Sequence, residues 1–146
     1  MIDAMNKRPI GRTTLSVTGL GLGGTTFGNM STAMKSGAAD ATVGAALVAG
    51  IRYFDTAPLY GFGLSESRLG EALKQTPRNE IVISSKVGYN LVPVEPSQVK
   101  AKIFVQPAAM RPEFDFTRDA VLRSIEASLK RLGHVLHRHA GDPRSR

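Results

Sequence analysis

The sequence predicts an α/β protein whose elements alternate in the order β-α-β-α-β-α. Short apolar runs at residues 51–55 and 81–86 have the length and composition of buried strands. Segments that follow such runs, including residues 118–132, carry apolar residues at helical spacing. Strands that alternate with helices form parallel βαβ units. The sheet could be open and doubly wound or part of a barrel, because periodicity alone does not distinguish the two.

The first part of the chain is expected to form a hairpin and one strand–helix unit. Residues 7–18 are typical of a short hairpin with its turn near Gly11. Residues 20–24 indicate a short buried strand that runs into a glycine-rich segment. Asp40 is the expected N-cap of a helix over residues 41–49, which are rich in alanine and are followed by a glycine as the stop signal.

The middle of the chain is expected to supply the second helix and the third strand. Ser65 is the expected N-cap of a helix that continues to about Leu73. Glu66 lies in its first turn, where the helix dipole favours a carboxylate. A Pro-Arg-Asn segment then interrupts the chain before the strand at residues 81–86.

The last part is expected to be a long loop followed by a third helix. Residues 88–116 contain four prolines and show no clear period, which indicates a loop. Thr117 is the expected N-cap of the helix that follows. The predicted apolar face of this helix comprises Val121, Leu122, Ile125, Leu129 and Leu132.

Length and composition exclude several kinds of protein. A chain of 146 residues is expected to form one domain. It has no cysteine, which excludes a disulfide framework, a zinc–thiolate site and a cysteine nucleophile. Its apolar stretches are too short to cross a bilayer, and its first residues lack the apolar core of a signal peptide. The expected location is the cytoplasm, with no membrane partner.

The net charge of +7 arises from 19 lysines and arginines against 12 aspartates and glutamates. Such a charge permits binding to nucleic acid or to another acidic surface. The cations are scattered, however, and no basic arm or aromatic-interleaved basic strand is present. A solvated basic surface without a nucleic-acid partner is therefore expected.

Three residues with proton-transfer chemistry follow the predicted strands. Asp55 ends the second strand, Tyr60 lies five residues later, and Lys86 ends the third strand. Parallel α/β proteins gather functional groups at the carboxyl ends of their strands. A phenol needs a nearby cation to release its proton near neutral pH, and a lysine removed from water needs a carboxylate. The three residues form a coherent set for proton transfer, although a turn-capping aspartate, an exposed tyrosine and a surface lysine would look the same.

The glycine-rich segment at residues 21–29, GLGGTTFGN, could contact a cofactor. It does not match the G-x-G-x-x-G pattern that leads directly into a helix. Its glycines could let a cofactor approach the backbone closely, or they could serve tight turns. The segment alone leaves both interpretations open.

Four segments together resemble the aldo-keto reductase family. The run GIRYFDTAPLYGFGLSESRLGEAL at residues 50–73 resembles the family's second strand, loop and helix. Residues 19–29 resemble its first strand and loop, residues 83–88 its third strand, and residues 114–133 its third helix. The resemblance covers about residues 8–133. Within the family it is closest to the branch that oxidises aldoses such as L-fucose, and pyridoxal dehydrogenases are similar.

The resemblance implies a fold and an activity. The chain would be the N-terminal part of a (β/α)₈ TIM barrel with an N-terminal β-hairpin, containing about three of the eight βα units. It would transfer hydride between NAD or NADP and a sugar or another small carbonyl or alcohol, without a metal. Tyr60 would be the general acid/base, Lys86 would tune its pKa, and Asp55 would pair with Lys86. Gly24, Thr25 and Asp55 would lie against the cofactor.

The sequence departs from the family pattern near its end. Residues 1–133 are expected to form the partial barrel, and residues 134–146 a tail without family character. The family's catalytic histidine ends a fourth strand, a role that is not transferred to the histidines of the tail. These are His134, His137 and His139. Residues 139–146 can be encoded so that a one-base shift reads Met-Leu-Val-Ile-His-Asp-Pro-Asp, which resembles the expected strand, so a frameshift is one hypothesis.

A barrel that lacks its later strands would keep an open edge at the third strand. Barrels of this type place phosphate contacts in the loops after the seventh and eighth strands. Weak cofactor binding and little turnover are therefore expected of the chain alone. The alternative to an enzyme is a non-catalytic fragment that is unstable or that self-associates through the open sheet edge.

Overall fold

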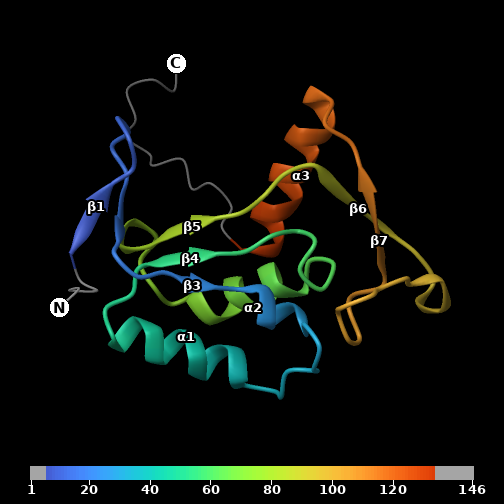
Figure 1. Ribbon diagram of the computed structural model, residues 1–146, viewed down its shortest axis with the longest axis horizontal. Coiled ribbons are helices and arrows are strands. Elements are labelled where there is room, and N and C mark those ends of the chain that lie inside the picture. The colour runs from blue at the N-terminus through green and yellow to red at the C-terminus, as the bar shows by residue number, and fades with distance from the viewer. Residues whose placement is uncertain (1–5, 134–146) are drawn as a thin grey trace.

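The computed structural model describes residues 6–133, in which the predicted alternation of strands and helices is confirmed (Figure 1). A two-stranded antiparallel hairpin comes first, then a parallel sheet of three short strands in the order β3-β4-β5, and then a second antiparallel hairpin. The strands are β1 (Lys7–Pro9), β2 (Ser16–Thr18), β3 (Leu22–Gly23), β4 (Tyr53–Asp55), β5 (Val82–Ser84), β6 (Tyr89–Pro93) and β7 (Met110–Phe114). The helices are α1 (Ala38–Val48), α2 (Leu64–Leu73) and α3 (Arg118–Arg131), with 3₁₀ turns η1 (Thr25–Gly28), η2 (Arg78–Glu80) and η3 (Pro96–Gln98).

The core lies between the parallel sheet and helices α1 and α2, which run along one side of it (Figure 1). Phe54, in the middle of β4, is fully buried on this side. Val43 of α1 and Leu69 and Leu73 of α2 pack into the same cluster. Because side chains alternate along a strand, the two neighbours of Phe54 face the opposite side of the sheet.

Helix α1 begins earlier than the sequence predicts. Its N-cap is Gly37, with a positive φ of 75°, and Asp40 lies inside the first turn. The prediction that Asp40 is the cap is therefore wrong: a glycine enters the helix from the left-handed region, which side chains rarely adopt. The predicted end at Gly50 is confirmed, and the N–H of Ile51 reaches back to the carbonyl of Ala46 at 2.9 Å.

Helix α2 also begins before its predicted cap. Gly63 is the N-cap, and Ser65 is a fully buried residue of the first turn. The Ser65 hydroxyl donates to the carbonyl of Gly24 at 2.6 Å, which ties α2 to the end of β3. Its single proton is used in that bond, so the Thr56 hydroxyl donates to Ser65 Oγ at 2.9 Å. Ser65 therefore joins two strands to the helix instead of capping it.

The segment predicted as one long loop contains a β-hairpin. Strands β6 and β7 pair over five residues, from Tyr89 opposite Phe114 to Pro93 opposite Met110. Two of the four prolines, Pro93 and Pro112, lie in these strands, and each strand of a two-stranded hairpin has a free edge where a missing N–H costs nothing. Pro96 and Pro107 lie in the connection between the strands. The rings of Tyr89 and Phe114 pack at 5.4 Å between centroids.

Helix α3 begins as predicted but buries a different face. The Thr117 side chain accepts a hydrogen bond from the N–H of Ala120 at 3.4 Å, which confirms the cap. The buried positions are mainly small residues, among them Ala120, Ser124 and Ser128. Leu122 and Ile125, which were predicted to pack inward, are 44% and 42% exposed. Only Leu132 of the predicted face is buried.

The exposed side of α3 borders a cleft of about 310 Å³ beside β5. Ile125 and Leu129 line one wall, and Ile83 and Val87 line the other. Within residues 6–133, β5 pairs with β4 on one edge and with no strand on the other. The apolar stripe that the sequence predicts is therefore present on α3. It faces this cleft, beside the unpaired edge of β5, instead of a packed core.

Two sequence predictions concern the ends of the chain. The tail at residues 134–146, with its histidines and its proposed frameshift, lies outside the described residues. Among residues 6–133, no helix is both long enough and apolar enough to cross a membrane.

A buried ion pair joins α2 to α3 and generates the first prediction. Glu66 is fully buried, and its Oε2 accepts from Arg131 Nε at 2.7 Å. Removing the cation leaves an uncompensated buried carboxylate, so Arg131→Ala should lower the free energy of unfolding by about 3 kcal/mol. Urea unfolding followed by circular dichroism measures this loss.

The matched control is Arg123→Ala, at an exposed position of the same helix. It should change the free energy of unfolding by about 0.5 kcal/mol or less. Equal urea midpoints for the two variants would show that the Glu66–Arg131 pair does not stabilise the packing of α3.

Candidate active site

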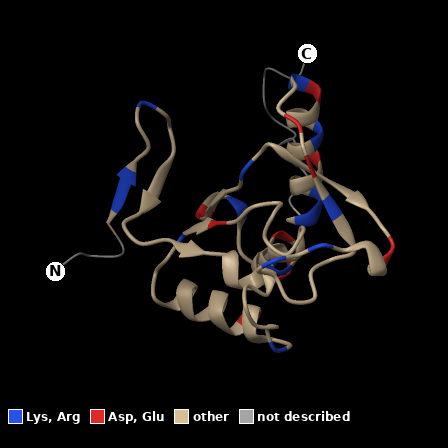
Figure 2. Cartoon of the chain, turned by 45° about the vertical axis from the view of Figure 1, so that its right-hand side comes forward, with Lys and Arg blue, Asp and Glu red and all other residues tan. Residues whose placement is uncertain are grey.

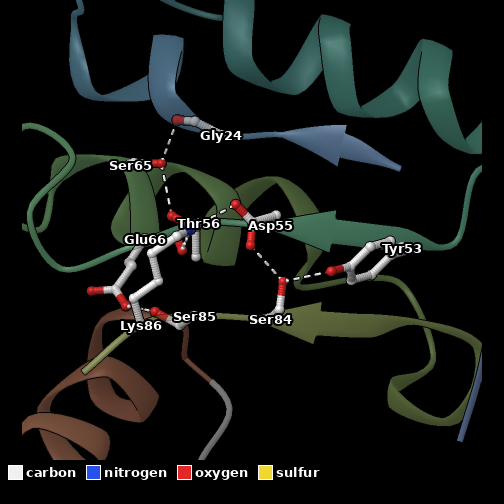
Figure 3. Close-up of polar contacts among 9 residues, drawn as sticks. All are labelled: Gly24, Tyr53, Asp55, Thr56, Ser65, Glu66, Ser84, Ser85 and Lys86. Atoms are coloured by element: carbon white, nitrogen blue, oxygen red, sulfur yellow. Dashed lines mark hydrogen bonds and ion pairs between the residues drawn. The ribbon is translucent and has the colours of Figure 1, made fainter. Parts of the chain in front are cut away.

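The carboxyl ends of β4 and β5 bring two of the predicted residues into contact (Figure 3). Asp55 is the last residue of β4, and Lys86 follows β5 by two residues. Lys86 Nζ donates to Asp55 Oδ2 at 2.7 Å and to the carbonyl of Thr56 at 2.9 Å. The strands run parallel with Asp55 opposite Ser84, and Lys86 lies two residues beyond Ser84. The Asp55 and Lys86 side chains therefore leave the same face of the sheet.

Tyr60 lies in the loop between β4 and α2, beside this pair. Lys86 Nζ lies 4.9 Å from the centroid of the Tyr60 ring. This loop packs tightly against Gly28. A Cβ at residue 28 would come within 2.5 Å of the Tyr60 backbone. The structure thus brings Asp55, Tyr60 and Lys86 together, as the sequence predicts.

The charge state of Lys86 follows from its partners. Partial burial acts to lower the pKa of the Lys86 ammonium, but hydrogen bonding and charge interactions with Asp55 and Tyr60 outweigh burial and raise it. Lys86 therefore carries its positive charge throughout the neutral range.

The two other predicted positions lie where β3 meets β4. The N–H of Gly24 donates to the carbonyl of Asp55 at 2.7 Å, and η1 begins at Thr25. A Cβ at Gly24 would come within 2.8 Å of the same carbonyl oxygen. Close packing against β4 therefore requires a glycine at residue 24. Thr25 is half-buried at the edge of the site.

Gly23 was not singled out from the sequence, yet it borders the site. It pairs in register with Asp55, so its α-hydrogens share a face with the Asp55 side chain. A Cβ added at Gly23 would meet no atom within 4 Å. Open space therefore lies beside the carboxylate, and the adjacent glycines of the segment GLGG were the available signal.

Ser84 was also missed, and it touches the carboxylate directly. Its hydroxyl donates to Asp55 Oδ1 at 2.7 Å, and Tyr53 Oη lies 3.0 Å from Ser84 Oγ (Figure 3). The next residue, Ser85, donates to Glu66 Oε1 at 2.7 Å on the other side of the sheet. The available signal for Ser84 was its position in the strand predicted to neighbour Asp55. That signal is weak, because the sequence alone does not show which residues of the two strands lie opposite each other.

The connection between β6 and β7 closes one side of the site. The N–H of Val105 donates to the carbonyl of Asn29 at 2.9 Å, and the N–H of Ala108 donates to the carbonyl of Gly61 at 3.0 Å. Phe104 is buried between them, with its centroid 6.4 Å from that of Tyr60. The loops after β3 and β4 are therefore joined through a third segment.

A small pocket of about 170 Å³ opens next to Tyr60 and Lys86. Its walls are mainly apolar side chains of the loop before Tyr60, together with Val87 and Tyr89. Among residues 6–133, no cluster of three or more histidine, aspartate or glutamate side chains could hold a metal ion.

The charges on the described residues are dispersed. Figure 2 shows basic segments on β1, on α3 and in the loops between them, and α3 carries acidic residues as well. The structure therefore gathers no basic stripe on α3, where the two signs alternate along the helix.

The fold and site define a parallel α/β protein with an aspartate, a tyrosine and a lysine gathered at the carboxyl ends of its strands. The sequence profile of the Aldo/keto reductase family matches residues 19–137. The chain belongs to this family of oxidoreductases, whose members generally use NAD or NADP.

Individual relatives agree with this assignment. D-threo-aldose 1-dehydrogenase of a Pseudomonas species is 43% identical over 124 residues, which are 82% of this chain and 37% of the relative. Pyridoxal 4-dehydrogenase of Microbacterium luteolum is 38% identical, over 90% of this chain and 41% of its own length. The chain thus spans about two fifths of these relatives.

Solved structures confirm that the described part is a segment of this family's barrel. A glycerol dehydrogenase from Gluconobacter oxydans superposes with a TM-score of 0.65 at 27% identity, over 89% of this chain and 36% of that one. An aldo-keto reductase from Bacillus halodurans superposes with a TM-score of 0.66 at 29% identity, over 88% and 37%. The prediction of a partial barrel is confirmed, and the open doubly wound alternative is wrong.

The raised pKa of Lys86 generates a prediction about alkaline stability. A group whose pKa is higher in the folded chain stabilises the fold below its ordinary value of 10.5 and ceases to do so above its folded value. The difference in unfolding free energy between the wild-type chain and Lys86→Met should therefore be constant near neutral pH and shrink above about pH 10.5.

Urea unfolding at a series of pH values measures this difference. A Lys86→Met difference that stays constant across the alkaline range would contradict the raised pKa of Lys86.

Proposed function

We propose that this chain carries the proton-transfer part of an NAD(P)-dependent oxidoreductase site. The observation that carries the proposal is the contact of Lys86 with Asp55 at 2.7 Å, beside the Tyr60 ring at 4.9 Å. The three side chains come from two strand ends and one loop. Membership in the aldo/keto reductase family supports the same roles.

In this proposal Tyr60 is the general acid/base. When an alcohol is oxidised, the Tyr60 oxygen accepts the proton of the substrate hydroxyl, and when a carbonyl is reduced, the Tyr60 hydroxyl donates a proton to the oxygen. Lys86 stabilises the phenolate form by its charge. Asp55 balances and orients Lys86, so that the cation stays at the phenol.

The residues present fit a nicotinamide cofactor. Open space at Gly23 beside the Asp55 carboxylate leaves room for a flat ring on the sheet. Gly24, Thr25 and Asp55 would lie against the cofactor, which would supply or accept a hydride at its nicotinamide carbon. The proposed cofactor is NAD or NADP, and a cytoplasmic location, where both are present, belongs to the same proposal.

The proposed substrate is a sugar or another small carbonyl or alcohol. The relatives are named for aldose, pyridoxal and glycerol oxidation, and all of these compounds are small polyols or hydroxyl-bearing aldehydes. Because the chain spans about two fifths of these relatives, we propose that turnover by the chain alone is slow. Barrel enzymes of this type draw substrate and phosphate contacts from later loops.

The proposal predicts that Tyr60→Phe loses activity without losing the fold. The ring that packs near Phe104 is kept, whereas the acid/base oxygen is removed. Oxidation of D-threo-aldoses with NAD or NADP should fall at least about 100-fold, the usual contribution of a general acid/base. The assay is run on this chain and on the chain joined to the later strands of the Pseudomonas relative.

Titration of NADH and NADPH fluorescence on the same proteins separates chemistry from binding. Cofactor affinity should change little in Tyr60→Phe, and thermal melting should be unaltered. Wild-type turnover by Tyr60→Phe would remove Tyr60 from the mechanism.

A second candidate is a non-catalytic chain that self-associates. The observation in its favour is apolar exposure at the uncovered side of β5 and α3, where Leu122 and Ile125 are 44% and 42% exposed. An unpaired parallel edge beside an apolar stripe can pair with another chain.

This candidate predicts that Ile125→Glu reduces association. Sedimentation velocity over a range of concentrations should show larger species for the wild type and mainly monomers for the variant. Val48→Glu is the matched control, because Val48 is 91% exposed on α1, away from β5. If the wild type is monomeric at every concentration, the second candidate fails and the first is unaffected.

A further inference from the structure

We propose that Tyr53 and Ser84 are positioning residues, which hold the Asp55 carboxylate toward Lys86 through a directed pair of hydrogen bonds. The inference rests on the proposed function, because it concerns the same carboxylate. Neither residue touches Lys86 or Tyr60 in the described contacts, and neither was assigned a role from the sequence.

The direction of the two bonds follows from the count of protons. Asp55 is an acceptor, so the Ser84 hydroxyl donates its only proton to Asp55 Oδ1 at 2.7 Å. Ser84 Oγ can then only accept from Tyr53, whose hydroxyl lies 3.0 Å away. The chain of donors runs one way, from Tyr53 through Ser84 to Asp55.

The strand geometry places all three groups on one face. Tyr53 and Asp55 are two residues apart in β4, and Ser84 pairs in register with Asp55. The Tyr53 ring packs against Gly21, the residue before β3, where a Cβ would come within 2.7 Å of the ring. Gly21 therefore makes room for the ring. Figure 3 shows the Tyr53 hydroxyl directed at Ser84.

The two oxygens of the Asp55 carboxylate bind different partners. Oδ1 accepts from Ser84, and Oδ2 accepts from Lys86 at 2.7 Å. The Lys86 and Asp55 side chains are 48% and 38% exposed. An ion pair this exposed is weak and loses side-chain entropy on forming. A hydroxyl bond to a carboxylate is stronger than a neutral hydrogen bond, so Ser84 determines where Oδ2 points.

The neighbouring serine provides a natural comparison. Ser85 also donates to a carboxylate at 2.7 Å, but this is Glu66, on the opposite side of the sheet. The two serines are adjacent in sequence and make the same type of bond. Only the Ser84 bond is connected to Lys86 through a shared carboxylate.

The test follows the titration of Lys86 in the 146-residue chain by NMR of lysines carrying ¹³C-methyl labels. The Lys86 resonance is assigned by its loss in Lys86→Arg. In Ser84→Ala the pKa of Lys86 should shift downward, because Asp55 no longer holds its position at the ammonium. Ser84→Thr, which keeps the hydroxyl, should restore it, and Tyr53→Phe should shift it downward by less than Ser84→Ala.

Ser85→Ala is the matched control and should leave the Lys86 titration at its wild-type value. An unchanged pKa in both Ser84→Ala and Tyr53→Phe overturns the proposal, and so does an equal shift in Ser85→Ala. If Ser84→Ala does not fold, Tyr53→Phe decides alone, because it retains the ring that packs on Gly21.

The readout does not depend on turnover, so the two proposals can fail separately. If the proposed function is wrong, neither the wild-type chain nor the joined chain will oxidise the substrate, while the Lys86 pKa still shifts in Ser84→Ala and Tyr53→Phe. Loss of the positioning role would leave the oxidation intact and remove the shifts.

Discussion

The close approach of Gly24 to the end of β4 is the contact on which the rest of the site depends. The Gly24 N–H bonds the carbonyl of Asp55, and the Gly24 carbonyl accepts from Ser65 at the start of α2. Gly24 therefore joins the end of β3, the end of β4 and the start of α2. With the backbone of Asp55 fixed in this way, its side chain can only leave the sheet on the face where Lys86 lies.

A second constraint acts from the helical side. Glu66 is removed from water, and Ser85 and Arg131 together satisfy its oxygens. A buried carboxylate without such partners would be strongly unfavourable, so α3 must dock with Arg131 at this point. Two carboxylates thus flank β5, one on each face, and adjacent serines bind them. Asp55 lies at the proposed site of proton transfer, and Glu66 binds Arg131 of α3.

The sequence predicted the parts of the fold that rest on local patterns. Alternating elements and the cap at Thr117 follow from hydrophobic period and cap chemistry. The meeting of Asp55, Tyr60 and Lys86 was left open by the strand ends alone and was implied by the family resemblance. The β6–β7 hairpin was missed because its prolines conceal the strand pattern and its pairing is a contact between distant residues. The role of Ser65 was misassigned because a serine at a helix start looks the same whether it caps the helix or bonds another strand.

The segment between β6 and β7 has a consequence for motion beside Tyr60. Its backbone bonds the loop after β3 at Asn29 and the loop after β4 at Gly61, and its buried Phe104 packs near the Tyr60 ring. Two loops that are far apart in the sequence are therefore linked through a third segment. Displacing one of the three breaks a backbone bond to another, so we expect these segments to move together.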